Sequence, residues 1–162
     1  MTTDTNPDIT TTVRRSVVVE APVERAFAFF TNDIGEWWDP DKHLLEEPLA
    51  EMIFQTHVGG HIIDRGVNGG ENRWGTVLVF DPPTKVVFSW DIDLGWQIET
   101  NPARRSEVHV TFSAAGDGRT LVELEHRHLD RHGDGWETMR DAVDSPKGWS
   151  LDPYAKALAD AA

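Results

Sequence analysis

The sequence predicts an α+β fold in which a curved antiparallel sheet of six to seven strands grips a long C-terminal helix. Strand patterns follow one another from about residue 44 to residue 129, with no helical pattern between them. Helical patterns gather instead near the two ends of the chain, where two short helices are expected after the first strand. The last helical region is the only one large enough to cover a sheet of this size.

The first elements follow from local patterns near the N-terminus. Residues 13–20 (VRRSVVVE) read as a strand. Pro22 then stands at the first helical position, where its missing amide costs nothing. The next residues form one apolar stripe of a short helix, namely Val23, Ala26, Phe27 and Phe30. A second short helix begins at residues 36–38, and Pro40 ends it.

The most informative segment is residues 59–90, which reads as three strands joined by two turns. Val67-Asn68-Gly69-Gly70 tolerates positive φ and closes a hairpin between residues 61–65 and 73–80. Asp81-Pro82-Pro83-Thr84 removes two amide donors and ends the second strand before residues 85–90 begin the third. A meander of this kind predicts a curved sheet that encloses a binding cavity.

Two later strands alternate cleanly, and a helical region follows them. Residues 107–112 place three apolar side chains on one face, namely Val108, Val110 and Phe112. Residues 120–129 place two apolar side chains and two histidines on one face, namely Val122, Leu124, His126 and His128. A final helical region begins near Gly135 and runs to the C-terminus, with an interruption at residues 145–148.

Composition limits the class of protein. The chain has 162 residues, so we expect residues 11–162 to form one domain after a disordered segment at 1–10. It has no cysteine, which excludes disulfides and thiolate metal sites. No apolar run is long enough to cross a bilayer, and the polar N-terminus is no secretory signal, so a cytoplasmic location is expected. A net charge of −13 argues against binding to nucleic acid or anionic membranes.

The chain resembles the START-like helix-grip (SRPBCC) superfamily. Within it, the similarity is to bacterial proteins that are related to the activator of the 90-kDa heat-shock-protein ATPase. Six phrases carry the resemblance in the same order: VEAPVERAFAFFTN, VGGHIIDR, WGTVLVFDPPTKVVFSW, TLVELEHRHL, LDRHGDGW and GWSLDPYAKAL. The resemblance implies a seven-stranded sheet around the C-terminal helix, with a cavity for a hydrophobic or amphipathic molecule. It brings no fixed catalytic motif, and a fold alone implies no reaction.

Several side chains are candidates for contact with the ligand. The aromatic and thioether candidates are Trp74, Trp90, Trp136, Met139 and Trp149, although plain core packing explains any one of them. Asp64 and Arg65 point to opposite faces of their strand, so one of them must look toward the cavity. Trp37 and Trp38 are expected near the cavity mouth, and the long loop at 91–105, which carries Trp96, is expected to form a lid.

The histidines could serve either structure or chemistry. His126 and His128 share a strand face and precede His132, a pattern that can present imidazoles to zinc. Structural packing is the preferred interpretation, and we expect no metal and no cofactor. No nucleophile motif or phosphate-binding loop is present.

Three functions stay open from the sequence. The first is a non-enzymatic protein that binds a small hydrophobic or aromatic ligand. The second is a cyclase- or hydrolase-like enzyme for a polyketide-type or aromatic substrate, with His126, Asp64 or Arg65 as acid–base groups. The third is a modulator of a chaperone ATPase. A homodimer is compatible with the sequence, which marks no interface.

Overall fold

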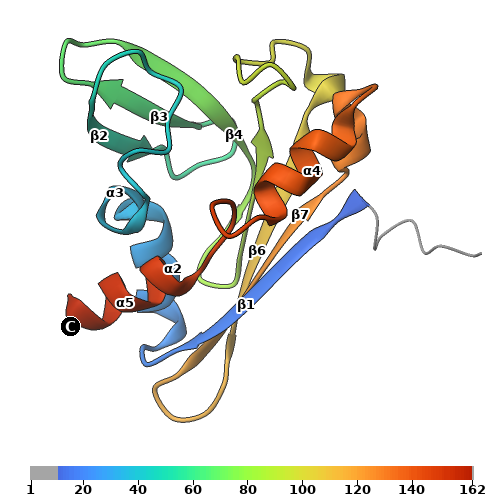
Figure 1. Cartoon of the computed structure of the whole chain (residues 1–162). Coiled ribbons are helices and arrows are strands. Elements are labelled where there is room, and N and C mark those ends of the chain that lie inside the picture. The colour runs from blue at the N-terminus through green and yellow to red at the C-terminus, as the bar shows by residue number, and fades with distance from the viewer. Residues whose placement is uncertain (1–10, 162) are drawn as a thin grey trace, which may run out of the picture.

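The computed structural model describes residues 11–161, so the expected disorder of residues 1–10 concerns a segment outside them. Within these residues, seven strands form one antiparallel sheet in the order β1-β7-β6-β5-β4-β3-β2 (Figure 1). The strands are β1 (Val13–Val19), β2 (Leu49–Phe54), β3 (His61–Gly66), β4 (Glu71–Asp81), β5 (Lys85–Trp90), β6 (Ser106–Ala114) and β7 (Thr120–Arg127). The expected sheet and both expected turns are confirmed.

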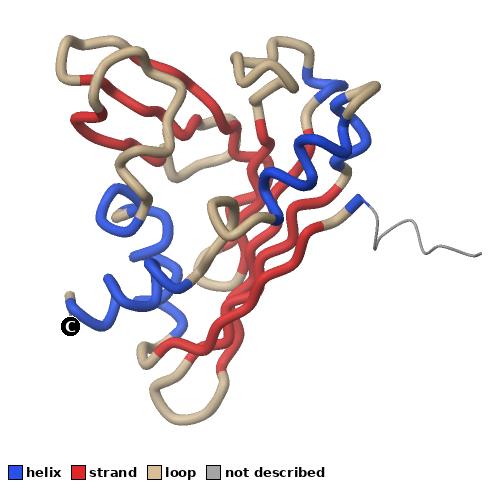
Figure 2. The backbone as a smooth tube through the Cα atoms, in the orientation of Figure 1, coloured by secondary structure: helices blue, strands red, loops and turns tan. Residues whose placement is uncertain are grey.

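The helices lie on one side of the sheet (Figure 2). They are α2 (Val23–Asn32), α3 (Ile34–Trp37), α4 (Trp136–Asp144) and α5 (Asp152–Asp160), with short 3-10 turns η1 (Pro102–Arg104) and η2 (Leu129–His132). Two short helices do follow the first strand, although Pro22 occupies the N-cap of α2 and not its first turn. Across residues 11–161 no helix combines the length and apolar character needed to span a bilayer.

The sheet is bent by irregularities in the pairing of β2, β3 and β4. The register shifts between Leu49 and Glu51, between Ile62 and Ile63, and between Val77 and Val79. An extra residue on one strand bends it and increases its twist. These shifts therefore help to curl this end of the sheet around the helices, which creates the concave side seen in Figure 1.

The expectation of one long C-terminal helix is wrong in detail, because two nine-residue helices, α4 and α5, take its place. Pro146 cannot continue the hydrogen-bond ladder of α4. The amide of Trp149 turns back to the carbonyl of Val143 at 2.8 Å. A Cβ atom at Gly148 would lie 2.2 Å from that carbonyl oxygen, so the turn needs glycine. The interruption noted at residues 145–148 is thus a turn that ends α4 and separates it from α5.

Tyr154 holds α5 against the two N-terminal helices. Its ring is fully buried, 5.3 Å from the ring of Phe30 and 5.5 Å from that of Trp37. Its hydroxyl donates to the carbonyl of Ala26 at 2.7 Å, which satisfies the one polar atom of the side chain. The alternating faces of β6 and β7 complete this core from the sheet side, as their patterns predict.

Replacement of Gly148 by alanine should destabilise the protein by about 1–3 kcal/mol, because the new methyl group overlaps backbone atoms that cannot move freely. Urea denaturation would measure the loss. Gly35→Ala is the matched control, since its Cβ would meet its nearest neighbour, Met52, at an ordinary 3.7 Å. Equal stability of the two variants would show that the turn before Trp149 does not depend on glycine.

Candidate ligand-binding site

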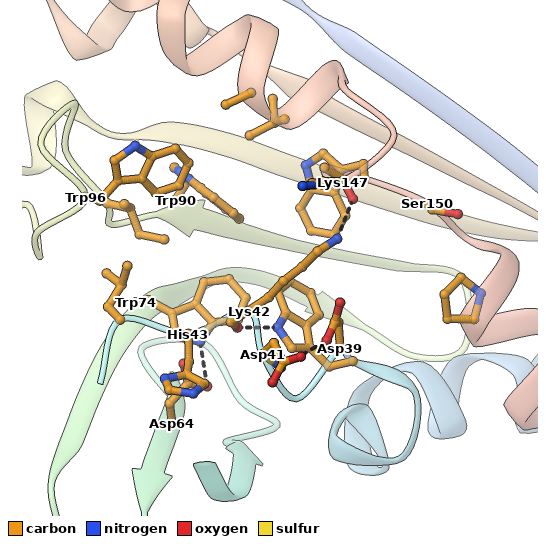
Figure 3. A pocket seen from close by; sticks show the side chains of 18 of the residues that line it. Asp39, Asp41, Lys42, His43, Asp64, Trp74, Trp90, Trp96, Lys147 and Ser150 are labelled. Carbon is orange, nitrogen blue, oxygen red and sulfur yellow. Dashed lines mark hydrogen bonds between the residues drawn. The ribbon is translucent and has the colours of Figure 1, made fainter. Parts of the chain in front are cut away.

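A cavity of about 280 Å³ lies between the concave side of the sheet and the segment that joins α4 to α5. Tryptophan dominates its wall: six of the seven tryptophans in the chain line it. They are Trp37, Trp38, Trp74, Trp90, Trp96 and Trp149. Figure 3 shows three of them, Trp74, Trp90 and Trp96, around the cavity, together with polar residues at its rim.

The indole rings come from separate segments and contact one another in series. Trp74 on β4 and Trp90 on β5 have ring centroids 5.5 Å apart at 69°. Trp38, after α3, lies 5.1 Å from Trp74 and 5.7 Å from Trp149. Tilted and edge-to-face contacts at these distances are favourable between aromatic rings. The rings therefore form a continuous apolar wall with a defined shape.

Asp64 places a carboxyl group in this apolar wall. It shares the inner face of β3 with Ile62, and only 2% of its surface is exposed. The indole N–H of Trp74 donates to its Oδ1 at 3.1 Å (Figure 3). Burial raises the pKa of Asp64 to about 6, although the Trp74 hydrogen bond and the nearby His43 oppose the shift. A carboxyl with such a pKa can both accept and return a proton near neutral pH.

The segment after Trp38 forms a polar rim at the cavity. The indole N–H of Trp38 donates to the carbonyl of Lys42 at 2.8 Å. The ammonium group of Lys42 donates in turn to the carbonyl of Gly148 at 3.1 Å, which joins this segment to the turn between α4 and α5. Asp39, Asp41, His43 and Lys147 also contribute to the lining. This rim was not predicted from the sequence, where its one signal is a charged stretch directly after two tryptophans.

His126 does not reach the cavity. It is completely buried behind Trp149, whose indole N–H donates to its Nδ1 at 3.0 Å. Its Nε2 lies 2.7 Å from Oγ of Ser106, which lies 2.7 Å from Nε2 of His132. Because an indole N–H can only donate, the hydrogen-bond network assigns the proton of His126 to Nε2. His126 therefore orients Trp149 and is not an acid–base group facing a ligand.

The remaining predicted site residues lie outside the lining. Arg65 alternates with Asp64 across the pleat and makes exposed ion pairs with Glu51 at 3.0 Å and Glu71 at 2.7 Å. Trp136 lies under the guanidinium group of Arg140, 5.1 Å from its ring centroid. Met139 is buried in the hydrophobic core. The structure thus brings together Trp74, Trp90 and Asp64 and does not add Arg65, Trp136 or Met139 to them.

The histidine pair on residues 126 and 128 does not form a common face. β7 ends at Arg127, and His128 has a left-handed backbone with φ of 63°, so it leaves the strand alternation. His132 meets His126 only through Ser106. In the part of the chain that the structure describes, no group of three histidine, aspartate or glutamate side chains is arranged to hold a metal ion.

The fold and the cavity together define a helix-grip protein, a curved antiparallel sheet that encloses a ligand-sized space against helices. The chain belongs to the family described as Activator of Hsp90 ATPase homolog 1-like protein, whose model matches residues 20–151. No curated protein matches the chain.

Solved structures place this chain beside proteins with different described activities. The anthrahydroquino-gamma-pyrone synthase Txn09, solved in complex with a ligand, is 38% identical, covers 94% of this chain and 99% of its own, and superposes with a TM-score of 0.66. CalC, a self-sacrificing resistance protein from Micromonospora echinospora, is 28% identical over 94% of each chain, with a TM-score of 0.62. An Hsp90 activator from Plasmodium falciparum, 18% identical with a TM-score of 0.50 over 82% of this chain and 86% of its own, shares the fold.

Protonation of His126 should make folding depend on pH. Burial lowers its pKa to about 3, against about 6.5 when unfolded. The free energy of unfolding should therefore fall as the pH is lowered from 6.5 toward 3, by about 1.4 kcal/mol per pH unit from this residue. His126→Asn, followed by urea denaturation between pH 7 and 4.5, should show a smaller slope than the parent protein. Identical slopes would mean that His126 is not the group that titrates.

Proposed function

We propose that this protein binds a flat aromatic molecule of polyketide type in the tryptophan-lined cavity. The convergence of six indole rings on one cavity is the observation that carries the proposal. Ligand sites are mostly apolar with a few directed polar groups, and Asp64 with the rim at residues 39–43 supplies such groups here. The ionised Asp64 could accept a hydrogen bond from a phenolic hydroxyl of the ligand.

The known relatives support this choice of ligand over a purely aliphatic one. The anthrahydroquino-gamma-pyrone synthase Txn09 is 38% identical to this chain over nearly the whole of both chains. Aromatic rings also bind indole walls through edge and face contacts that an alkyl chain lacks. Modulation of a chaperone ATPase remains an alternative that the family description suggests, but no feature of the cavity favours it.

Binding can be tested with 1,8-dihydroxyanthraquinone, a flat aromatic probe with phenolic hydroxyl groups. Titration should quench tryptophan fluorescence to saturation, since the probe would lie against several indoles. Trp38→Ala should raise the dissociation constant about tenfold, because it removes a ring that links Trp74 to Trp149. Trp136→Ala, outside the lining, is the matched control and should bind as the parent does. A lack of saturable binding by the parent protein would contradict the proposal.

A cyclase-like activity in the same cavity is the second candidate, and Asp64 favours it. A carboxylate with a pKa near 6, buried beside the cavity, can take the proton from a phenol or enol of the ligand. The resulting oxygen anion can add to an unsaturated ketone in the same molecule, which forms a C–O bond. The proton then returns from Asp64 to the carbon next to the carbonyl. Atoms and charges balance within one substrate, so the ring closure needs no cofactor.

Asp64→Asn separates binding from catalysis. The variant should still bind dihydroxyanthraquinone, because the amide oxygen of asparagine can accept the same phenolic hydrogen bond. It should lose turnover of an aromatic phenol bearing an unsaturated ketone by about 10²- to 10⁴-fold, because the amide cannot take a proton. Product formation would be followed by mass spectrometry and absorbance. Since the pKa of Asp64 is raised, its ionised form costs folding free energy above pH 6, and that cost disappears below about pH 4. The variant should thus be at least as stable as the parent at pH 8, so that lost turnover cannot be blamed on unfolding.

The outcome with the parent protein decides between the two candidates. Binding without any turnover of such phenols would leave the protein as a carrier. Turnover that survives in Asp64→Asn would show that another group moves the proton.

A further inference from the structure

Trp96 is an unusual residue on the wall of the cavity. It is 44% exposed, although it lines the cavity together with four buried tryptophans and the half-buried Trp38. Its backbone has φ of 59°, a left-handed conformation that bulky side chains rarely adopt. Such a conformation costs free energy for most residues. Glycine adopts it without this cost, and asparagine adopts it at a reduced cost. Neither burial nor backbone preference therefore explains a tryptophan at this position.

The loop that carries Trp96 is rigidly built. Oδ1 of Asp93 accepts the amides of Gly95 at 2.8 Å and Gln97 at 2.9 Å, so the tip is a closed turn. Ile92 and Ile98 pair as an isolated antiparallel bridge below it. This small hairpin presents the indole at the cavity.

A buried ion pair anchors the base of this hairpin to the sheet. Asp91 is 2% exposed and accepts hydrogen bonds from Thr76 at 2.7 Å and Ser89 at 2.5 Å. Arg105 lies 3.2 Å from Asp91 and also donates to the carbonyl of Glu99 at 2.7 Å. Both ends of the loop are thereby tied together and to β4 and β5. The expected lid at residues 91–105 is an ordered structure with an aromatic group at its tip.

We infer that Trp96 is a clamp residue, whose indole covers the outer face of a ligand that lies against Trp90 and Trp74. Figure 3 shows Trp96 beside Trp90 on one side of the cavity, with Lys147 on the other side. A ligand in the cavity would bury the exposed part of this ring, and the apolar contact would favour binding. The inference rests on the proposed ligand-binding function, because it assigns Trp96 a place in that same site.

Two substitutions of Trp96 test the clamp with dihydroxyanthraquinone as probe. Trp96→Asn removes the ring but keeps a residue that tolerates the left-handed backbone, and it should raise the dissociation constant about tenfold. Trp96→Phe keeps an aromatic face and should raise the dissociation constant no more than about threefold. Thermal unfolding without ligand supplies the second readout. The midpoint of Trp96→Asn should equal or exceed that of the parent, since the ring contributes to binding and not to folding.

A double-mutant cycle tests the role of the anchor. Arg105→Gln shortens the side chain so that it cannot bond both Asp91 and the carbonyl of Glu99, and it should weaken probe binding in the parent background. In the Trp96→Asn background the same change should have little further effect, because Arg105 acts as a positioning residue through Trp96. Additive losses would show that Arg105 acts on the fold as a whole.

The outcomes separate the clamp from the binding function. Saturable binding by the parent with equal affinity in Trp96→Asn would overturn the clamp and leave the proposed function standing. A fall in the unfolding midpoint of Trp96→Asn as large as that of Trp90→Ala would overturn it too, by making Trp96 a core residue. Absence of probe binding by the parent would overturn both.

Discussion

The turn between α4 and α5 is the point on which the cavity depends. Gly148 lets the chain fold back until the amide of Trp149 reaches the carbonyl of Val143. Three distant segments then bind this turn: Lys42 donates to the carbonyl of Gly148, Arg15 donates to that of Trp149, and His126 accepts from the Trp149 indole. In a continuous helix these two carbonyls would accept intrahelical amides, whereas in the turn they accept from Lys42 and Arg15. The turn thus contributes Gly148 and Trp149 to the cavity wall, and the three hydrogen bonds hold that part of the wall in place.

Two buried titratable groups near the cavity, Asp64 and His126, have pKa values that are shifted in opposite directions. His126 has both ring nitrogens in hydrogen bonds and no access to the cavity, so its lowered pKa serves to keep the Trp149 support neutral. Asp64 receives one hydrogen bond from the described residues and faces the cavity, so its raised pKa bears on whatever enters. Perturbed pKa values mark functional sites only when the group can meet a ligand. By that criterion Asp64, and not His126, is the candidate for proton transfer to or from a ligand.

Local patterns predicted most of the fold, because strand alternation and turn chemistry depend on neighbouring residues. Because Asp64 and Arg65 are consecutive residues of one strand, the sequence predicts that one of them points inward, but it does not say which. That choice depends on the register of β3 against β4, where a bulge follows Ile62. The inward position of His126 was predictable, whereas its cover by Trp149 is a contact between distant segments. Trp136 and Met139 both belong to α4, and what each of them contacts depends on how that helix packs against distant segments.

Binding and ring closure need nearly the same cavity, and this bears on how the family can hold such different activities. A carrier needs the aromatic wall and a polar contact, and a cyclase needs only that the polar contact also moves a proton. Here the wall is built by Trp38, Trp74 and Trp149, while the proton-bearing group is one side chain on β3. Loss or gain of catalysis would therefore leave the tryptophans, the turn at Gly148 and the fold unchanged. For this reason the identity of the residue at position 64, and the pKa its surroundings impose, is more informative about activity than the overall similarity of the fold.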